Sequence, residues 1–297
     1  MAASLVGHHR GSIVATILSG DTSVLAATAG RSFVKMSGSG NDFIMIDATS
    51  EPARGLLNPE VVRAICTRRI GVGADGLVML EPSEIADFKI LYLNSDGSHA
   101  SLCGNASLCS ARLALNLGII GQREFRMETD AGVLAGRFVD GGPEIDLPSV
   151  HDVLREMPFR QGPGESWIGF ADSGVPHLVI RMDEVVGVDV ARRGRPLRYD
   201  PSLAEGANVN FVAPDGDGGW RMRTYERGVE GETLACGTGA VATAILLAEH
   251  GDVQGTVGLL TQSGRTLQVR LERQGDAWFP SLSGEARVIY EARFPER

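Results

Sequence analysis

Short apolar runs bounded by glycine-rich and Asp-Gly turns recur along most of the chain, and they predict β-strands. The segment 32–47, SFVKMSGSGNDFIMID, predicts two strands joined by a glycine-rich turn. The segment 87–98, DFKILYLNSDGS, predicts a strand that ends in an Asp-Gly turn. Further strands are predicted in the second half, for example over 167–182 and 207–214. We therefore expect a protein that is rich in strands.

Three longer segments predict helices. The first, 58–69, has an apolar stripe that includes Cys66, and Asn58 is its predicted N-cap. The other two, about 104–118 and 237–251, are apolar most of the way round, and each ends in a glycine. Because a helix that is apolar on all sides is buried on all sides, a sheet wrapped around each of them would satisfy the pattern.

The order of strands, turn and buried helix occurs twice along the chain. Cys103 and Cys236 are 133 residues apart, and the turn glycines Gly132 and Gly264 are 132 residues apart. Two landmarks with almost the same offset indicate an internal duplication. We expect an α+β fold of two pseudo-symmetric lobes, each a mostly antiparallel sheet or barrel around one central helix, with the active site in the cleft between them.

The duplication also suggests where the lobes begin and end. Residues 32–148 would form the first lobe and residues 149–297 the second, although the last strand could pack on the first lobe. Residues 1–31 contain a short apolar stretch that resembles a signal peptide only faintly, and Asp21 interrupts it. We expect this segment to be a disordered extension.

Composition narrows the partners. With 43% hydrophobic and 22% charged residues, the chain is typical of a globular protein. Its formal net charge of −9 argues against nucleic acid or an anionic membrane as a partner. No apolar run has the length that a membrane-spanning helix needs. The 4 cysteines lack a CxxC spacing, which argues against a disulfide framework or a zinc site and fits the cytoplasm.

The sequence also gives little support for a cofactor. Lys35 and Lys89 are the only lysines among 28 basic residues, so a pyridoxal phosphate Schiff base has few possible positions. The segment 71–76, GVGADG, matches a dinucleotide-binding pattern, but it follows a predicted helix and precedes a strand. We interpret that match as accidental, and we expect neither a cofactor nor a metal.

Two similar stretches, SLCGNASLC at 101–109 and LACGTGAVA at 234–242, each place a Cys-Gly pair at the start of a predicted helix. The first N–H groups of a helix have no internal partner and carry partial positive charge. They can lower the pKa of a thiol and can bind a carboxylate. Gly104 and Gly237 would let an anion approach these groups closely.

If both helices point into one cleft, Cys103 and Cys236 would lie on opposite sides of a small acid. One thiolate would take the α-proton from one face, and the other thiol would return a proton to the opposite face, which inverts the stereocentre. Two helix termini stabilise a nearby charge by about 4 kcal/mol at most, whereas enzymes lower activation barriers by about 8–23 kcal/mol. A closed cleft that orients the thiolate is therefore required. Cys109 points elsewhere and is expected in the core.

Other polar residues could serve the same cleft. Glu226 and Arg227 are adjacent on a predicted strand, where they would either divide between cleft and support or form a surface ion pair. His177 follows a proline beside an apolar strand, and a structural and a functional role are equally open for it. Asn208 and Asn210 lie in an apolar strand, where an amide needs partners.

Five motifs, in order, resemble the diaminopimelate epimerase family: MSGSGNDF, GVGADG, NSDGS…LCGN, GVPH and YERGVEGETLACGTGA. The resemblance runs from about residue 33 to the C-terminus, and the last motif is the most specific. It implies a PLP-independent isomerase with two related lobes and two catalytic cysteines that is usually a homodimer. It further implies conversion of LL-diaminopimelate to the meso form, on the route to lysine and peptidoglycan.

The resemblance also implies roles for individual residues. Cys103 and Cys236 would be the acid–base pair, and His177 and Glu226 would assist their ionisation. The reacting carboxylate would bind to the backbone of four residues, Gly104, Asn105, Gly237 and Thr238. The amino groups and the distal carboxylate would bind to a second set, Asn41, Asn94, Asn208, Glu226 and Arg227.

Four positions depart from the family pattern: Val175, Gly76, Ser37 and His99 stand where many members have Asn, Gln, His and Glu. The segment after Asn105 departs as well. The alternatives are a related PLP-independent racemase of another amino acid, such as histidine, an isomerase of the phenazine-pathway type, and a non-catalytic dithiol redox or ligand-binding protein. Two well-placed cysteines argue against the phenazine type, which lacks them. Arg227 favours a second carboxylate, since a guanidinium pairs with it in two-pronged fashion.

Overall fold

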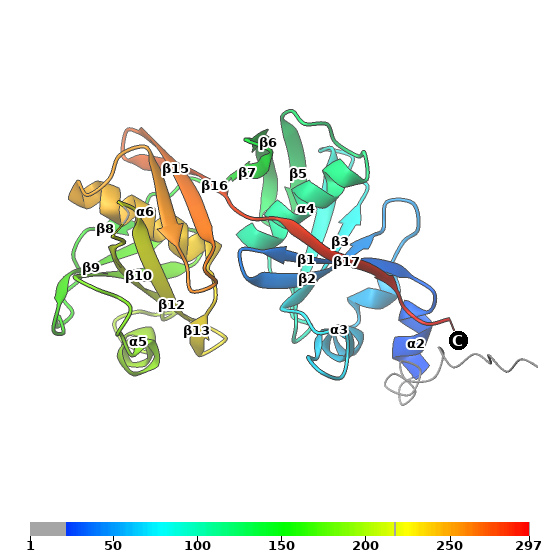
Figure 1. Cartoon of the computed structure of the whole chain (residues 1–297), viewed down its shortest axis with the longest axis horizontal. Coiled ribbons are helices and arrows are strands. Elements are labelled where there is room, and N and C mark those ends of the chain that lie inside the picture. Colours follow the sequence, from blue (N-terminus) through cyan, green and yellow to red (C-terminus); the bar gives the residue numbers. More distant parts are fainter. Residues whose placement is uncertain (1–21, 217, 297) are drawn as a thin grey trace, which may run out of the picture.

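The computed structural model describes residues 22–216 and 218–296, which fold into two lobes joined along one side (Figure 1). The strands of the first lobe are β1 (Ser32–Gly38), β2 (Asn41–Asp47), β3 (Gly76–Glu81), β4 (Phe88–Asn94), β5 (Phe125–Thr129), β6 (Gly132–Val139), β7 (Gly142–Asp146) and the C-terminal β17 (Arg287–Arg293). Its helices are α2 (Thr22–Thr28), the 3₁₀ helix η1 (Arg54–Leu57), α3 (Pro59–Cys66) and α4 (Gly104–Asn116).

The second lobe has its own set of elements. Its strands are β8 (Val153–Leu154), β9 (Glu165–Asp172), β10 (Pro176–Met182), β11 (Asn208–Pro214), β12 (Trp220–Glu226), β13 (Gly231–Thr233), β14 (Thr256–Leu260), β15 (Thr266–Gln274) and β16 (Ala277–Ser283). Its helices are α5 (Val190–Arg198) and α6 (Gly237–His250).

The strand pairing repeats between the lobes. In the first lobe, β1–β2, β3–β4, β5–β6 and β6–β7 are antiparallel, whereas β2–β3 and β4–β5 are parallel. The second lobe has the same order of pairings in β9–β10, β10–β11, β11–β12, β12–β14, β14–β15 and β15–β16. The prediction of an α+β fold with two pseudo-symmetric lobes is confirmed.

Each lobe closes around one buried helix. Helix α4 packs against β1, β2, β3, β4 and β7, and α6 packs against β9, β10, β11, β15 and β16. Most residues of both helices are buried, and this burial explains why no polar face was visible in the sequence. Gly251, in the left-handed conformation, ends α6 as predicted, and Cys66 and Cys109 are buried in the core.

The two lobes exchange strands where they meet. Strand β16 pairs with β15 on one side and with β7 of the first lobe on the other. The chain then crosses to the first lobe, where β17 pairs with β1 (red in Figure 1). The short β8 has the equivalent place in the second lobe, beside β9. These exchanges hold the two buried helices at a fixed distance from each other.

Part of the segment 1–31, which was expected to be a disordered extension, is a helix in the structure. Residues 22–28 form α2, because Val24 is buried beside Phe33, Leu56 and Phe294. Residues 1–21 lie outside the described part of the chain. None of the helices in the described ranges is long and apolar enough to span a membrane.

The burial of α6 makes a testable prediction. Leu246 is fully buried, and replacing it with alanine leaves a cavity. We expect Leu246→Ala to lower the free energy of unfolding by about 2–5 kcal/mol, measured by urea titration. Leu117→Ala, at an exposed leucine that ends α4, is the matched control and should change it by less than about 1 kcal/mol. Equal losses in both variants would contradict the burial of α6.

Candidate active site

The two predicted helix starts meet at the junction of the lobes. Cys103 and Cys236 are the N-caps of α4 and α6 and share nearly the same backbone angles, φ −137°, ψ 113° and φ −138°, ψ 111°. A Cβ atom added to Gly237 would lie 3.7 Å from the Cα atom of Gly104. Added Cβ atoms on Gly104 and Gly237 would also lie only 2.7 Å and 3.1 Å from Leu282 Cδ2. A side chain at either glycine would therefore require Leu282 to move.

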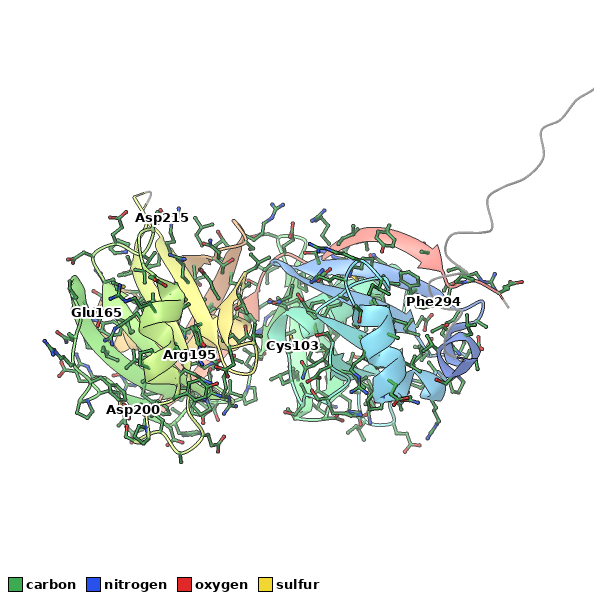
Figure 2. The ribbon with its side chains drawn as sticks, turned by 90° about the horizontal axis from the view of Figure 1, so that it is seen from below. Cys103, Glu165, Arg195, Asp200, Asp215 and Phe294 are labelled. Carbon is green, nitrogen blue, oxygen red and sulfur yellow. The ribbon has the colours of Figure 1, made fainter. Side chains whose placement is uncertain are left out.

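A pocket of about 310 Å³ opens at this contact. Cys103 lies at the junction of the lobes in Figure 2. All but one of the predicted site residues line the pocket: Asn41, Asn94, Cys103, Gly104, Asn105, Asn208, Glu226, Arg227, Cys236, Gly237 and Thr238. The exception is His177. Residues that are distant in the sequence thus surround one volume, with one cysteine from each lobe.

The two sulfur atoms have different neighbours. The backbone N–H of Gly239 donates to Cys236 Sγ over 3.4 Å, and the Thr238 hydroxyl oxygen lies 3.6 Å from the same sulfur. Cys103 instead faces the N–H groups of Asn105 and Ala106, and the phenol of Tyr92 is placed to donate to its thiolate. The repeated helix start therefore carries two chemically distinct thiols.

Burial makes both thiols harder to ionise than a free cysteine. It raises the pKa of Cys103 to about 11 and that of Cys236 to about 12, and the Glu226 carboxylate acts in the same direction. The N–H groups of the helix starts oppose this shift, but a helix terminus contributes only about 0.3–2 kcal/mol. The helix starts therefore lower the thiol pKa as predicted, but desolvation outweighs them, so the pKa of each free thiol is raised overall.

His177 lies behind the pocket rather than in it. Its ring is fully buried, and burial together with the charge of Arg227 lowers its pKa to about 3, so it is neutral. Its Nε2 atom lies 3.0 Å from Thr238 Oγ1. His177 therefore reaches Cys236 only through the Thr238 hydroxyl, which differs from the expected place beside the thiols.

A hydrogen-bonded group of side chains positions the first-lobe wall. Asn105 Nδ2 donates to Asn41 Oδ1 over 2.6 Å, and Asn41 Nδ2 donates to Asp75 Oδ2 over 3.2 Å. Arg68 pairs with Asp75 at 2.8 Å from the outer side. Asn105 Oδ1 is buried and has no hydrogen-bond partner among the described residues. The wall thus leaves one buried acceptor beside the pocket.

The second-lobe wall is formed where β12 ends. Arg227 N–H donates to Asn208 Oδ1 over 2.8 Å, and Asn208 Nδ2 donates to the Pro176 carbonyl over 3.3 Å. The Arg227 guanidinium lies 3.5 Å from Glu205 Oε2, so Glu226 and Arg227 do not form the surface pair considered above. Burial raises the pKa of Glu226, which favours its protonated form. Both side chains line the pocket because the strand ends between them.

Two contributors were missed in the sequence. Tyr92 lines the pocket, and Asp75 holds Asn41 although it lies in GVGADG, which has no helix after it and joins α3 to β3. Gly76 lies against Tyr92, since an added Cβ atom would lie 2.5 Å from Tyr92 Cε2. Asn210, which the sequence did single out, has its contacts described below. Val175, alone among the four departures, lines the pocket.

The described ranges contain no group of three or more His, Cys, Asp or Glu side chains placed to hold a metal ion. What the pocket offers is a pair of thiols, two sets of helix N–H groups and a few amide, carboxyl and guanidinium groups. This set suits proton transfer at a carbon that is attached to a carboxylate.

Comparison with known proteins agrees with this chemistry. The family model described as diaminopimelate epimerase matches residues 33–146 and 169–289. The diaminopimelate epimerase of Gemmatimonas aurantiaca is 47% identical over 270 residues, which cover 87% of this chain and 97% of that protein. The diaminopimelate epimerase of Aquifex aeolicus is 39% identical over 275 residues, covering 89% and 98%.

Solved structures share the fold at low identity. A hydroxyproline epimerase from Agrobacterium vitis has a TM-score of 0.64 at 20% identity and covers 88% of this chain and 90% of its own. A Bacillus anthracis phenazine biosynthesis protein of the PhzF family has a TM-score of 0.69 at 13% identity and covers 88% and 98%. These likenesses concern the two-lobed architecture.

The fold, the paired helix starts and these relatives define the protein as an isomerase of the epimerase class. Within that class, the chain belongs to the diaminopimelate epimerase family, whose model matches most of its length.

The raised thiol pKa values predict the pH dependence of alkylation. Below its pKa, a thiol reacts in proportion to its thiolate fraction, so each pH unit should increase the rate about 10-fold. We expect iodoacetamide to modify Cys103 and Cys236 with rates that still rise at pH 10, measured by mass spectrometry of each peptide. A plateau below pH 8 at either cysteine would contradict the dominance of burial.

The phenol of Tyr92 should stabilise the thiolate of Cys103. A hydrogen bond to a charged group is worth about 1.5–3 kcal/mol, so its loss should slow alkylation at a fixed pH about 10-fold. We expect Tyr92→Phe to show this decrease at Cys103 but not at Cys236. Tyr290→Phe, at an exposed tyrosine on β17, is the matched control. An unchanged rate at Cys103 in Tyr92→Phe would reject the contact.

Proposed function

We propose that this chain interconverts LL- and meso-diaminopimelate without a cofactor, by proton transfer between its two cysteines and opposite faces of one α-carbon. One observation supports this most strongly: two helix starts with the same backbone angles and one cysteine each are in contact at one pocket. The relatives named diaminopimelate epimerase support the substrate. The products would serve lysine and peptidoglycan synthesis.

The reacting carboxylate would bind between the helix starts. The N–H groups of Gly104, Asn105, Gly237 and Thr238 lie in the first turns of α4 and α6 and line the pocket from both lobes. Removal of the α-proton moves negative charge onto the carboxylate oxygens. Backbone N–H groups that are already aimed at these oxygens stabilise that charge without reorganising. The α-carbon would then lie between the two sulfur atoms.

Ionisation of a thiol would accompany substrate binding. The free thiols are neutral at pH 7 because of their raised pKa values. A substrate ammonium group placed within a few ångströms favours a thiolate and lowers its pKa. One cysteine would then act as the base and the other, still protonated, as the acid. Glu226 and the unpartnered Asn105 Oδ1 are the acceptors available for that ammonium group.

The distal end of the substrate would be held by side chains that surround the same pocket. Arg227 would bind the second carboxylate, since its guanidinium has contacts only with the exposed Glu205, to its carbonyl at 3.2 Å and to its carboxylate at 3.5 Å, among the described residues. Asn41, Asn94 and Asn208 supply amide groups around it. Val175 contributes an apolar surface, so this end relies on Arg227 more than on the residue at position 175.

We further propose that the enzyme is a cytoplasmic homodimer. Each of its 4 cysteines is free, which fits a reducing compartment. An apolar groove of about 330 Å³ on the first lobe is lined by Phe33, Ile70, Val72 and Tyr290, among others. Within the described residues, β17 beside this groove pairs only with β1. A second copy of the chain would cover both the groove and the open strand edge.

The proposal is tested by incubating the protein in D₂O with a panel of amino acids that includes diaminopimelate and histidine. We expect deuterium at the α-carbon of diaminopimelate, read by NMR, without any added cofactor. If deuterium entered only another amino acid, that amino acid would be the substrate instead of diaminopimelate. If deuterium entered none of them, the epimerase proposal would be rejected in favour of a dithiol redox or binding protein.

Single replacements of the cysteines test the two-thiol mechanism. General acid or base catalysis by one positioned group contributes about 10²–10⁴-fold, so Cys103→Ala and Cys236→Ala should each lower epimerisation by at least that factor. Cys109→Ala is the matched control, since that cysteine is buried in the core and does not line the pocket. Retention of full activity in either Cys103→Ala or Cys236→Ala would overturn the mechanism.

A further inference from the structure

A chain of buried polar side chains leads to only one of the two cysteines. Thr224 Oγ1 donates to Asn210 Oδ1 over 2.9 Å, and Asn210 Nδ2 lies 3.1 Å from His177 Nδ1. His177 Nε2 lies 3.0 Å from Thr238 Oγ1, which lies 3.6 Å from Cys236 Sγ. Thr224, Asn210 and His177 are at most 2% exposed, so bulk water does not compete for these bonds.

The carbonyl of Leu178 fixes the direction of the amide. Asn210 Nδ2 donates to this carbonyl over 3.0 Å, and a carbonyl can only accept. The amide nitrogen therefore faces β10, and the amide oxygen faces the Thr224 hydroxyl. A flipped amide would place two acceptor oxygens against each other.

The orientation of Asn210 in turn fixes the tautomer of His177. The amide nitrogen that donates to the Leu178 carbonyl also faces His177 Nδ1, so Nδ1 is the acceptor. The ring is neutral and carries one proton, which must then be on Nε2. Nε2–H therefore donates to Thr238 Oγ1. Because that oxygen already accepts a hydrogen bond, the hydroxyl proton of Thr238 is free to point at Cys236 Sγ.

The backbone leaves room for this arrangement only beside Cys236, in the second lobe. A Cβ atom at Gly239 would overlap Asn210 Oδ1 and lie 3.2 Å from Cys236 Sγ. In the first lobe, Ala106 stands three residues after Cys103, as Gly239 does after Cys236. The residue two positions after Cys103 is Asn105, whose amide is bonded to Asn41, whereas the matching residue after Cys236 is Thr238. The duplication therefore gave the two thiols different support.

We propose that Asn210 is a positioning residue that, through His177 and Thr238, directs a hydroxyl proton at Cys236 and so stabilises its thiolate. The proposal rests on the proposed function only in that Cys236 is taken to react with substrate. The other ionisable groups near this chain are Glu226 at the end of β12, Cys103 at the start of α4, and Arg227, whose charge acts on His177. The charge of none of these three groups depends on the tautomer of His177.

The variant Asn210→Asp reverses the direction of the hydrogen bonds that join residue 210, His177 and Thr238, and it gives the sharpest test. A carboxylate accepts from Nδ1–H, so the ring proton moves to Nδ1 and Nε2 becomes an acceptor. Thr238 would then donate to Nε2 instead of to the sulfur. We expect iodoacetamide modification of Cys236 at pH 8 to slow about 10-fold, while Cys103 in the same sample changes less than about twofold. The ¹⁵N NMR signals of His177 should show Nε2–H in the unmodified protein and Nδ1–H in the variant.

A second set of variants keeps the test decisive if Asn210→Asp does not fold. Thr238→Val removes the hydroxyl and should slow modification of Cys236 about 10-fold. Thr238→Ser keeps the hydroxyl and should leave the rate of modification unchanged. Thr243→Val is the matched control, because Thr243 is buried in the same helix and donates to Met222 sulfur outside the chain.

Two results would overturn the proposal. One is a proton on Nδ1 of His177 in the unmodified protein. The other is an unchanged Cys236 modification rate in Thr238→Val, whether or not Asn210→Asp folds. Neither readout depends on catalytic turnover. A failure of the epimerase proposal in the D₂O experiment can therefore be told apart from a failure of the proposal for Asn210.

Discussion

The contact between the first turns of α4 and α6 is the constraint on which the rest of this structure depends. Gly104 and Gly237 meet over Leu282, and a Cβ atom at either glycine would press on the Leu282 side chain at their contact. The strand that carries Leu282, β16, pairs with both lobes, so the framework that holds the helices together also forms the base of their contact. Both N–H sets and both cysteines face the same pocket as a direct result.

Burial decides the electrostatics of that pocket. It is strong enough to keep both thiols protonated in the free protein, although each lies at a helix start that favours a thiolate. The site therefore separates two tasks. The helix starts are arranged to hold a carboxylate, whereas ionisation of a thiol is left to side chains and to a bound ammonium group. Tyr92 serves Cys103, and Thr238 with the residues behind it serves Cys236.

The sequence was sufficient where local pattern determines structure. Apolar runs bounded by turns and two all-apolar helices led to the two-lobed fold, and the offset of Cys103 and Cys236 led to the duplication. Helix α5 was missed, since it contains Gly194 and Pro196, and an added Cβ atom at Gly194 would lie 2.6 Å from Tyr225 Cβ. Tertiary packing against β12 sustains a helix that propensity disfavours. Contacts across long sequence separations, such as Asp75 with Asn41 or Asn210 with His177, could not be read from spacing either.

The central claim, that the two helix starts jointly hold one carboxylate between two thiols, is tested most directly by a crystal structure with a bound diamino diacid. The carboxylate should accept hydrogen bonds from backbone N–H groups of both α4 and α6, and Cys103 Sγ and Cys236 Sγ should lie on opposite sides of the adjacent carbon. A carboxylate held by one helix alone, or both sulfur atoms on the same side of that carbon, would contradict it.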